Sequence, residues 1–244
     1  ENEDYEIAAF MQTADEVGGD YYDFYFQEPP YFGVFGDVSG HGLKSGLIMM
    51  MAEVAFNTLM GDPDLKQKDL SFLYQLINNT LYQNIQERLS KKSSLKRQYS
   101  YMYMTFRMFR CNSQGDFEMF GNDHAEPFVC RALDGEIQTL PSTGFLLGIK
   151  KDAIMETPPL TFSLQQGDLL VLFSDGITEA KKEPKEKANF KIKRTMFGDE
   201  RLHQVVTKHR HLSCQEIIEK VVEEVRLWMA DQEDDITLMI LKKK

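Results

Sequence analysis

Strand-like and helix-like patterns occupy separate stretches of this chain, and this separation constrains the fold more than any other feature. Short apolar or alternating runs bounded by turn residues predict strands, and apolar stripes at helical spacing predict helices. Strands are predicted at 5–10, 21–26, 31–35, 99–110, 116–120, 127–132, 136–139, 160–164, 168–174 and 236–241, and helices at 43–60, 69–89, 200–208 and 214–230. This order favours an α+β fold over a repeated strand–helix–strand unit.

Short turns between the predicted strands indicate antiparallel pairing. We expect strands 160–164 and 168–174 to pair with each other across the turn Gln165-Gln166-Gly167. Ser213, followed three residues later by Glu216, is expected to cap the last helix. The predicted architecture is therefore two stacked antiparallel β-sheets flanked by four helices, an αββα sandwich.

Length and charge limit the classes of function. The 244 residues suit one large domain, 1–244, and the net charge of −10 argues against nucleic acid as a partner. No apolar run approaches the roughly 20 residues that span a bilayer, so no direct membrane contact is expected. The 3 cysteines are widely spaced and odd in number, which favours a reducing compartment. Because the sequence begins with Glu1 rather than Met, we expect a cytoplasmic domain excised from a longer protein that sensor or membrane segments could anchor.

Four aspartates, Asp20, Asp37, Asp175 and Asp234, occur far apart in similar contexts of apolar residues and glycine. An apolar run that ends in a carboxylate is typical of a strand whose last residue emerges into a loop. Convergent carboxylates repel one another unless a cation lies among them, and hard divalent cations prefer oxygen ligands. A single Asp-Gly pair is usually a plain turn, but the combination of four predicts a two-metal site.

Two of these contexts carry further detail. Glycines beside Asp37 allow the backbone to approach a ligand closely, so the turn could present both a carboxylate and a main-chain carbonyl to one ion. Asp234 and Asp235 are adjacent and point in opposite directions along an extended chain. We therefore expect only one of them to be a ligand and the other to cap a turn.

The motifs together resemble one known family. The matching segments are Val17-Gly18-Gly19-Asp20-Tyr21-Tyr22-Asp23, Gly36-Asp37-Val38-Ser39-Gly40-His41-Gly42, Thr143-Gly144 with Leu147-Gly148, Gly167-Asp168, Ser174-Asp175-Gly176-Ile177-Thr178-Glu179-Ala180, Phe197-Gly198 with Arg201-Leu202, and Asp234-Asp235-Ile236-Thr237. They cover nearly the whole chain. The chain resembles the sporulation-stage-II-protein-E type of metal-dependent phosphatase, the bacterial branch of the type 2C serine/threonine phosphatases.

This resemblance implies two Mn²⁺ or Mg²⁺ ions at one end of the β-sandwich. Asp37 would bridge both ions, Asp175 and Asp234 would bind the first, the main-chain carbonyl of Val38 would bind the second, and Asp20 would act through water. The implied reaction is direct attack of an activated water on phosphoserine or phosphothreonine, without a phosphoenzyme. The implied substrate is a phosphorylated regulatory protein, a STAS-domain anti-sigma-factor antagonist, and upstream segments would control the domain and could form a homodimer.

The chain departs from the family pattern at the acid and at the phosphate clamp. Eukaryotic type 2C enzymes place a catalytic histidine two residues after the bridging aspartate, where this chain has Ser39. His41 is a candidate acid, and the alternative is a histidine that packs against or hydrogen-bonds the turn. Those enzymes also hold the phosphate with an arginine near the N-terminus, and this chain has none before Arg88. Lys44 is the nearest cation, and a solvated helix position is the alternative role.

A further departure lies in the loop 121–127, where the family usually has Asn-Ala-Gly-His. Here the histidine, His124, follows Asn122 by two positions, and Asp123 replaces a small residue. We expect His124 to be exposed and inert rather than a ligand.

The segment 181–197 is basic and longer than its family counterpart, with Lys181, Lys182 and Lys185 at its start. One hypothesis is a flap that steers an acidic phosphoprotein to the site. The alternative is a mobile solvated loop.

Two other functions remain open from the sequence. A non-catalytic phosphatase-like interaction module would keep the fold and bind metal poorly, and the altered loop and absent arginine are compatible with it. A two-metal nuclease or nucleotide phosphohydrolase would also use clustered carboxylates. The acidic composition opposes a nuclease.

Overall fold

The computed structural model describes residues 2–90, 102–153, 157–182 and 195–244. The described residues form two compact units. Unit 1 contains those of Glu1–Ala14, Pro127–Leu140 and Leu164–Lys244, and unit 2 contains those of Asp15–Glu126 and Pro141–Ser163. Whether residues 1–244 behave as the single domain expected from the sequence stays a prediction.

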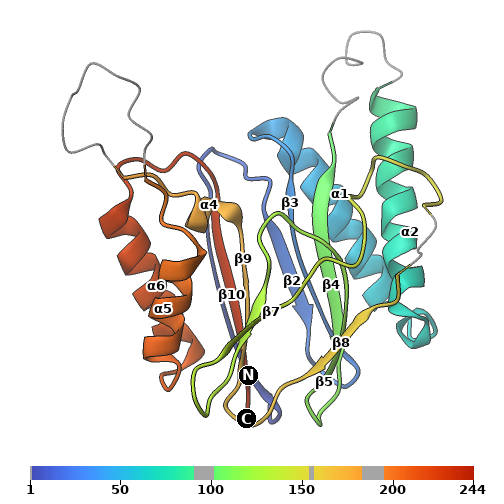
Figure 1. The fold of residues 1–244 in the computed structure, drawn as a ribbon. Helices are drawn as coiled ribbons and strands as arrows, with labels where there is room; N and C mark the ends of the chain where they lie inside the picture. The colour runs from blue at the N-terminus through green and yellow to red at the C-terminus, as the bar shows by residue number, and fades with distance from the viewer. Residues whose placement is uncertain (1, 91–101, 154–156, 183–194) are drawn as a thin grey trace, which may run out of the picture. The chain divides into compact units, whose positions relative to one another are not determined.

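Unit 1 is a five-stranded antiparallel sheet with helices packed on it (Figure 1). The strand order is β1-β10-β9-β6-β7, with bounds β1 Tyr5–Gln12, β6 Phe128–Cys130, β7 Ile137–Thr139, β9 Leu169–Phe173 and β10 Ile236–Lys243. Its helices are α4 Asp175–Thr178, α5 Asp199–His209 and α6 Cys214–Trp228. Helix α6 packs against β1 and β10, and α5 packs against α6.

The start of α6 confirms the predicted cap. The Glu216 main-chain N–H donates to the Ser213 hydroxyl, and the Glu216 carboxylate accepts from the Ser213 N–H. These reciprocal bonds satisfy backbone donors that the first turn of a helix leaves unpaired. The sequence signal was local, which is why it was reliable.

The predicted pairing of strands 160–164 and 168–174 is wrong. Strand β8, Leu160–Ser163, pairs with β5 in the sheet of unit 2, whereas β9 lies between β10 and β6 in unit 1. Every residue of β9 is buried, and such a strand needs a partner on both sides, while β8 is partly exposed and lies at a sheet edge. The turn before β9 is held instead by the Asp168 carboxylate, which accepts from the main-chain N–H groups of Gln165 and Ala132.

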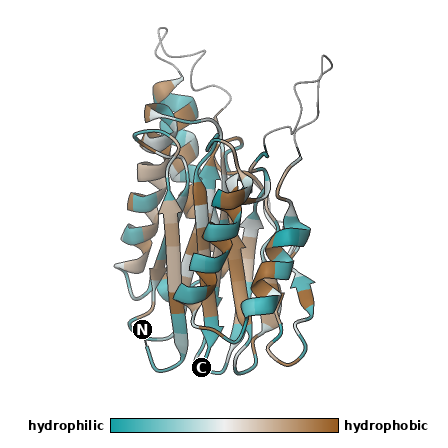
Figure 2. Cartoon of the chain, turned by 90° about the vertical axis from the view of Figure 1, so that its left-hand side faces the viewer, coloured by the Kyte–Doolittle hydropathy of each residue, from teal (hydrophilic) through white to brown (hydrophobic). Residues whose placement is uncertain are grey.

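Unit 2 is also built on a five-stranded antiparallel sheet (Figure 1). The strand order is β2-β3-β4-β5-β8, with bounds β2 Tyr21–Tyr25, β3 Tyr31–Val38, β4 Met104–Cys111, β5 Asp116–Asn122 and β8 Leu160–Ser163. Strands β2 and β3 are neighbours in the chain and pair antiparallel. Figure 2 shows the apolar character of the strands beside the mixed character of the helices.

Two long helices of unit 2 pack against its sheet. Helix α1, Leu43–Met60, contacts β2 and β3, and α2, Leu70–Tyr82, contacts β4 and β5. A short 3₁₀ helix, Leu65–Gln67, lies between them. The predicted helix 69–89 differs at its end, because Gln83–Leu89 continues α2 as a π-helix.

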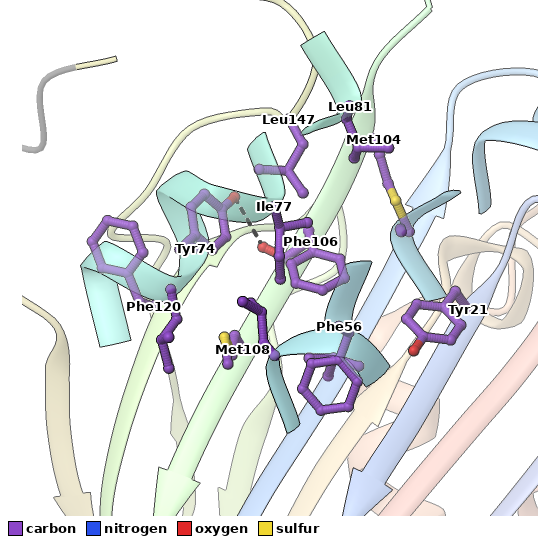
Figure 3. Close-up of a cluster of buried hydrophobic side chains, with 14 of the residues drawn as sticks. Tyr21, Phe56, Tyr74, Ile77, Leu81, Met104, Phe106, Met108, Phe120 and Leu147 are labelled. Atoms are coloured by element: carbon purple, nitrogen blue, oxygen red, sulfur yellow. Dashed lines mark hydrogen bonds between the residues drawn. The ribbon is translucent and has the colours of Figure 1, made fainter. Parts of the chain in front are cut away.

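The core of unit 2 lies between these helices and the sheet (Figure 3). Tyr74 of α2 is fully buried among Phe106, Phe120 and Ile77. Its hydroxyl donates to the main-chain oxygen of Phe106 at 3.2 Å, so the polar end of a buried ring is satisfied. This contact fixes α2 on strand β4.

Helix α1 also carries apolar side chains on the surface that faces away from the core. Leu43, Leu47, Met50 and Val54 are exposed. Several of them line a groove of about 620 Å³ between α1 and α2. Within the described residues, no helix combines the length and the apolar character that crossing a membrane requires.

Candidate metal centre

The four predicted aspartates divide equally between the two units. Asp20 and Asp37 belong to unit 2, and Asp175 and Asp234 belong to unit 1. Asp37 is the penultimate residue of β3, and Asp175 directly follows Ser174 after β9 as the first residue of α4. Asp20 precedes β2, so its interpretation as the end of a strand is wrong, whereas Asp234 precedes β10 in agreement with the predicted strand 236–241.

Strand β4 fixes the main chain of Asp37. The Asp37 N–H donates to the Thr105 hydroxyl at 3.0 Å, and that hydroxyl donates to the Asp37 main-chain oxygen at 3.2 Å. Thr105 is fully buried. One threonine side chain therefore satisfies both main-chain groups of the aspartate and holds it in register.

The Gly18-Gly19-Asp20 segment packs against the end of β3. The Val38 N–H donates to the Gly19 main-chain oxygen at 3.2 Å. A Cβ atom at Gly19 would lie 2.9 Å from the Val38 main-chain oxygen and 3.1 Å from Asp37 Oδ1. Two predicted ligand oxygens thus face the same point, and only a glycine leaves room there. Asp20, next in the chain, is buried.

Ser39, the residue after Val38, connects the centre to Tyr103 and His124. The Ser39 N–H donates to the Tyr103 main-chain oxygen, and the Tyr103 N–H donates to the Ser39 hydroxyl. The Tyr103 ring meets the ring of His124 edge to face, with ring centroids 6.2 Å apart. A ring nitrogen of His124 and a carboxylate oxygen of Asp37 lie within 4.8 Å of each other.

The loop that carries His124 is attached to a buried arginine. Arg107 of β4 is fully buried and donates to the Pro141 main-chain oxygen and to the Ser142 hydroxyl. Burial lowers the pKa of Arg107, and the nearby Asp123 carboxylate opposes that shift. Asp123, which replaces a small residue of the family pattern, thus offsets a buried positive charge.

His41 and Lys44 both lie near the start of α1. His41 is exposed, and its Nδ1 lies 2.7 Å from Asp15 Oδ2. Lys44 is exposed on the first turn of the helix. The catalytic role of His41 and the phosphate-binding role of Lys44 stay predictions.

In unit 1, the main chain of β10 positions Asp175. The Ser174 N–H donates to the Thr237 main-chain oxygen, and the Thr237 N–H donates to the Ser174 hydroxyl. A Cβ atom on Gly176 would lie 2.0 Å from the Asp235 main-chain oxygen. Helix α4 can therefore begin at Asp175 only because a glycine follows it.

Asp234 and Asp235 differ in burial and in bonding. Asp235 is buried, and its carboxylate accepts from the Ala14 N–H at 2.7 Å. Asp234 is exposed and lines a polar cavity of about 240 Å³ beside Gly176 and Glu179. The structural role of Asp235 leaves Asp234 as the ligand candidate of the pair.

The two described lysines of the basic segment have partners within unit 1. Lys181 Nζ lies 2.6 Å from Glu233 Oε2, and Lys182 Nζ lies 4.4 Å from the ring centroid of Trp228. Lys185 and most of the hypothetical flap lie outside the described residues. Substrate binding by Lys181, Lys182 and Lys185 stays a prediction.

Three residues beside Asp37 were not predicted from the sequence to take part in this centre. Thr105, Tyr103 and His124 reach it through strand register and loop packing, not through a local motif. The exposure expected of His124 is confirmed. Its closeness to Asp37 was not expected, and the unusual loop sequence was the available signal.

Comparison with known proteins places this chain in a family. Residues 29–244 match the family Stage II sporulation protein E (SpoIIE). The chain belongs to this family. The phosphoserine phosphatase RsbU of Bacillus subtilis (strain 168) is 27% identical over 243 residues, which make up 98% of this chain and 63% of that relative. The chain therefore spans less than two thirds of the relative's length.

Solved structures agree on the fold. The SiaA-PP2C domain of Pseudomonas aeruginosa superposes with a TM-score of 0.74 at 17% identity, covering 97% of this chain and 85% of that one. The catalytic domain of the serine threonine protein phosphatase PstP, in complex with 2 manganese ions, superposes with a TM-score of 0.60 at 13% identity and covers 98% of both chains. The chain thus belongs to the SpoIIE family and shares the fold of solved PP2C phosphatase domains.

Proposed function

We propose that this chain hydrolyses phosphoserine or phosphothreonine on a regulatory protein, with two Mn²⁺ or Mg²⁺ ions held by its aspartates. The observation that carries this proposal is the closeness of two candidate donors, because Asp37 Oδ1 and the Val38 main-chain oxygen would both lie about 3 Å from a Cβ atom on Gly19. Several oxygen donors held near one another are what a site for a hard divalent cation requires.

The residues present fit these ions chemically. The candidate donors are carboxylates and one main-chain carbonyl, which are the hard oxygen ligands that Mg²⁺ and Mn²⁺ prefer. Asp37 would bridge the ions, Val38 would contribute its carbonyl, and Asp20 would act through water. Asp175 and Asp234 would be the further ligands, a role that family membership supports.

Bound ions of this kind would lower the pKa of a water and neutralise charge on the phosphate oxygens. The contribution of the chain is to orient the donors before substrate arrives. Thr105 fixes the main chain of Asp37, and Ser174 fixes the start of α4 at Asp175. Preorganised donors need no rearrangement during the reaction, and this is where electrostatic catalysis gains most.

The proposed substrate follows from the family and from a relative's name. RsbU of Bacillus subtilis is called a phosphoserine phosphatase, which favours phosphoserine on a protein. We propose a phosphorylated STAS-domain anti-sigma-factor antagonist as the partner, and a cytoplasmic site of action. Regulation and dimerisation through segments outside this chain belong to the same proposal.

The test is hydrolysis of p-nitrophenyl phosphate with Mn²⁺, with a chelator, and by Asp37→Asn. Turnover should require Mn²⁺ and fall by about 100-fold or more in the variant, the scale of losing one well-placed electrostatic group. Asp69→Asn is the matched control, because Asp69 is exposed at the start of α2 and its side chain makes no capping bond. A folded sample without metal-dependent turnover, or full activity in Asp37→Asn, would contradict the proposal.

A further inference from the structure

His124 is the one histidine that the described residues place beside a predicted ligand of the metal centre. Its ring nitrogen and an Asp37 carboxylate oxygen lie within 4.8 Å. An ion with bonds of about 2.1 Å needs neighbouring ligand atoms about 3.0–4.2 Å apart, depending on the angle between them. A separation of up to 4.8 Å between these two atoms allows one ion to bind both groups after a small movement of the side chains.

The loop is attached to the rest of unit 2 in a way that keeps the ring there. Gly121 has a φ of 132°, and its main-chain oxygen accepts from the N–H groups of Thr143 and Gly144, both at 3.0 Å. A Cβ atom at Gly121 would lie 2.0 Å from the Phe106 main-chain oxygen. Since the loop begins in a conformation that only glycine tolerates, its direction is set before His124 is reached.

Arg107 and Tyr103 then fix the two sides of the loop. Arg107 binds Ser142, and the Asp123 N–H donates to that same hydroxyl at 3.4 Å. Tyr103 packs its ring against His124 while its main chain is paired with Ser39. Ser39 is only two residues beyond Asp37, so the His124 ring and the Asp37 carboxylate are held by one connected set of contacts.

We infer that His124 supplies an imidazole nitrogen to the divalent cation held at Asp37, so that the centre is a mixed nitrogen–oxygen site. This inference rests on the proposed function, because it assumes that Asp37 binds a metal ion. It also explains the altered loop sequence. The Asp123 carboxylate offsets the charge of the buried Arg107, and Arg107 in turn helps to position the loop that carries His124. An imidazole ligand disfavours Mg²⁺ relative to Mn²⁺ and later transition metals.

The direct test is pulsed electron paramagnetic resonance of the Mn²⁺-loaded chain, which detects a coordinated nitrogen through its ¹⁴N modulation. The wild type should show this modulation, and His124→Ala should lose it. His211→Ala is the matched control and should keep the modulation, since His211 is an exposed histidine in the segment between α5 and α6. Mn²⁺ loading without ¹⁴N modulation in the wild type, or unchanged modulation in His124→Ala, would overturn the inference.

Calorimetry gives a second readout that does not depend on activity. His124→Ala should weaken Mn²⁺ binding by about tenfold or more and Mg²⁺ binding by less. His124→Asp restores an oxygen donor, so it should recover binding, lack the nitrogen signal and shift preference toward Mg²⁺. If His124→Ala bound Mn²⁺ and Mg²⁺ as tightly as the wild type does, His124 would not be a metal ligand.

The two proposals fail in different ways. If the wild type binds Mn²⁺ and Asp37→Asn does not, but no nitrogen is coordinated, only the role of His124 is wrong. If the wild type binds no Mn²⁺, both the metal centre and its nitrogen ligand are refuted.

Discussion

Replacing Thr105 with valine should damage the centre without changing its shape. Valine has nearly the volume of threonine and lacks the hydroxyl that accepts from the Asp37 N–H at 3.0 Å and donates to the Asp37 main-chain oxygen at 3.2 Å. The side chain is fully buried, so no water reaches it to replace the hydroxyl. The change therefore isolates two hydrogen bonds.

The expected size follows from those two bonds. A buried donor without a partner costs about 1–3 kcal/mol. The added methyl group returns up to about 1 kcal/mol of hydrophobic stabilisation. We expect Thr105→Val to lower the free energy of unfolding by about 1–2 kcal/mol, a factor of about 5–30 in the unfolding equilibrium constant. Mn²⁺ affinity should fall by about tenfold, the low end for groups that orient a ligand, because the threonine holds the main chain of Asp37.

Urea denaturation in the presence of chelator measures the stability, because bound metal would otherwise stabilise the folded state. Calorimetric titration with Mn²⁺ measures the affinity. Thr105→Ser is the control: it keeps the hydroxyl and loses a buried methyl, so stability should fall by about 1 kcal/mol while Mn²⁺ affinity stays close to wild type. Wild-type Mn²⁺ affinity in Thr105→Val, or a variant more stable than wild type, would refute the reasoning.

Three further predictions concern packing, thiol burial and a helix cap. Gly176→Ala would place a Cβ atom 2.0 Å from a main-chain oxygen and should lower the stability measured by thermal melting by about 1–3 kcal/mol. Gly61→Ala is the control and should be tolerated, because the atoms nearest to its Cβ would be 3.5 Å away. Burial, and to a lesser degree the nearby Glu6 carboxylate, raises the pKa of Cys214 to about 12, and all three cysteines are buried. Ellman's reagent at pH 8 should therefore react with no thiol in the native chain and with all 3 in guanidinium. A thiol that reacts quickly in the native chain would contradict this prediction. Hydrogen bonds from Ser213 lower the pKa of Glu216 below its ordinary 4.5, so the stabilisation is present above that value and lost as pH falls through the folded pKa. The melting-temperature loss in Ser213→Ala should therefore be larger at pH 7 than at pH 3, and a loss that grows on acidification would disprove this explanation.

Local sequence signals predicted much of the fold. Helix α1 has the bounds expected from its pattern, because Gly42 and Gly61 flank it. The Ser213 cap was also predicted correctly. These features depend on neighbours within a few residues, and sequence patterns record such neighbours directly.

Features that depend on distant partners could not be predicted in the same way. The turn before β9 looked like a hairpin, yet burial of the whole strand required partners from elsewhere in the chain. His124 looked inert because its place beside Asp37 depends on Arg107 and Tyr103, which lie in a strand and segment far from it in sequence. A polar loop gives no local indication of which strand end it will meet.

The most direct test of the central claim is phosphate release from a phosphoserine peptide, titrated with Mn²⁺, by wild type, Asp37→Asn and Asp175→Asn. Both aspartates are assigned to the same ions, so each substitution alone should abolish Mn²⁺-dependent release. Asp69→Asn should release phosphate like the wild type. Wild-type rates in either Asp37→Asn or Asp175→Asn would contradict the account.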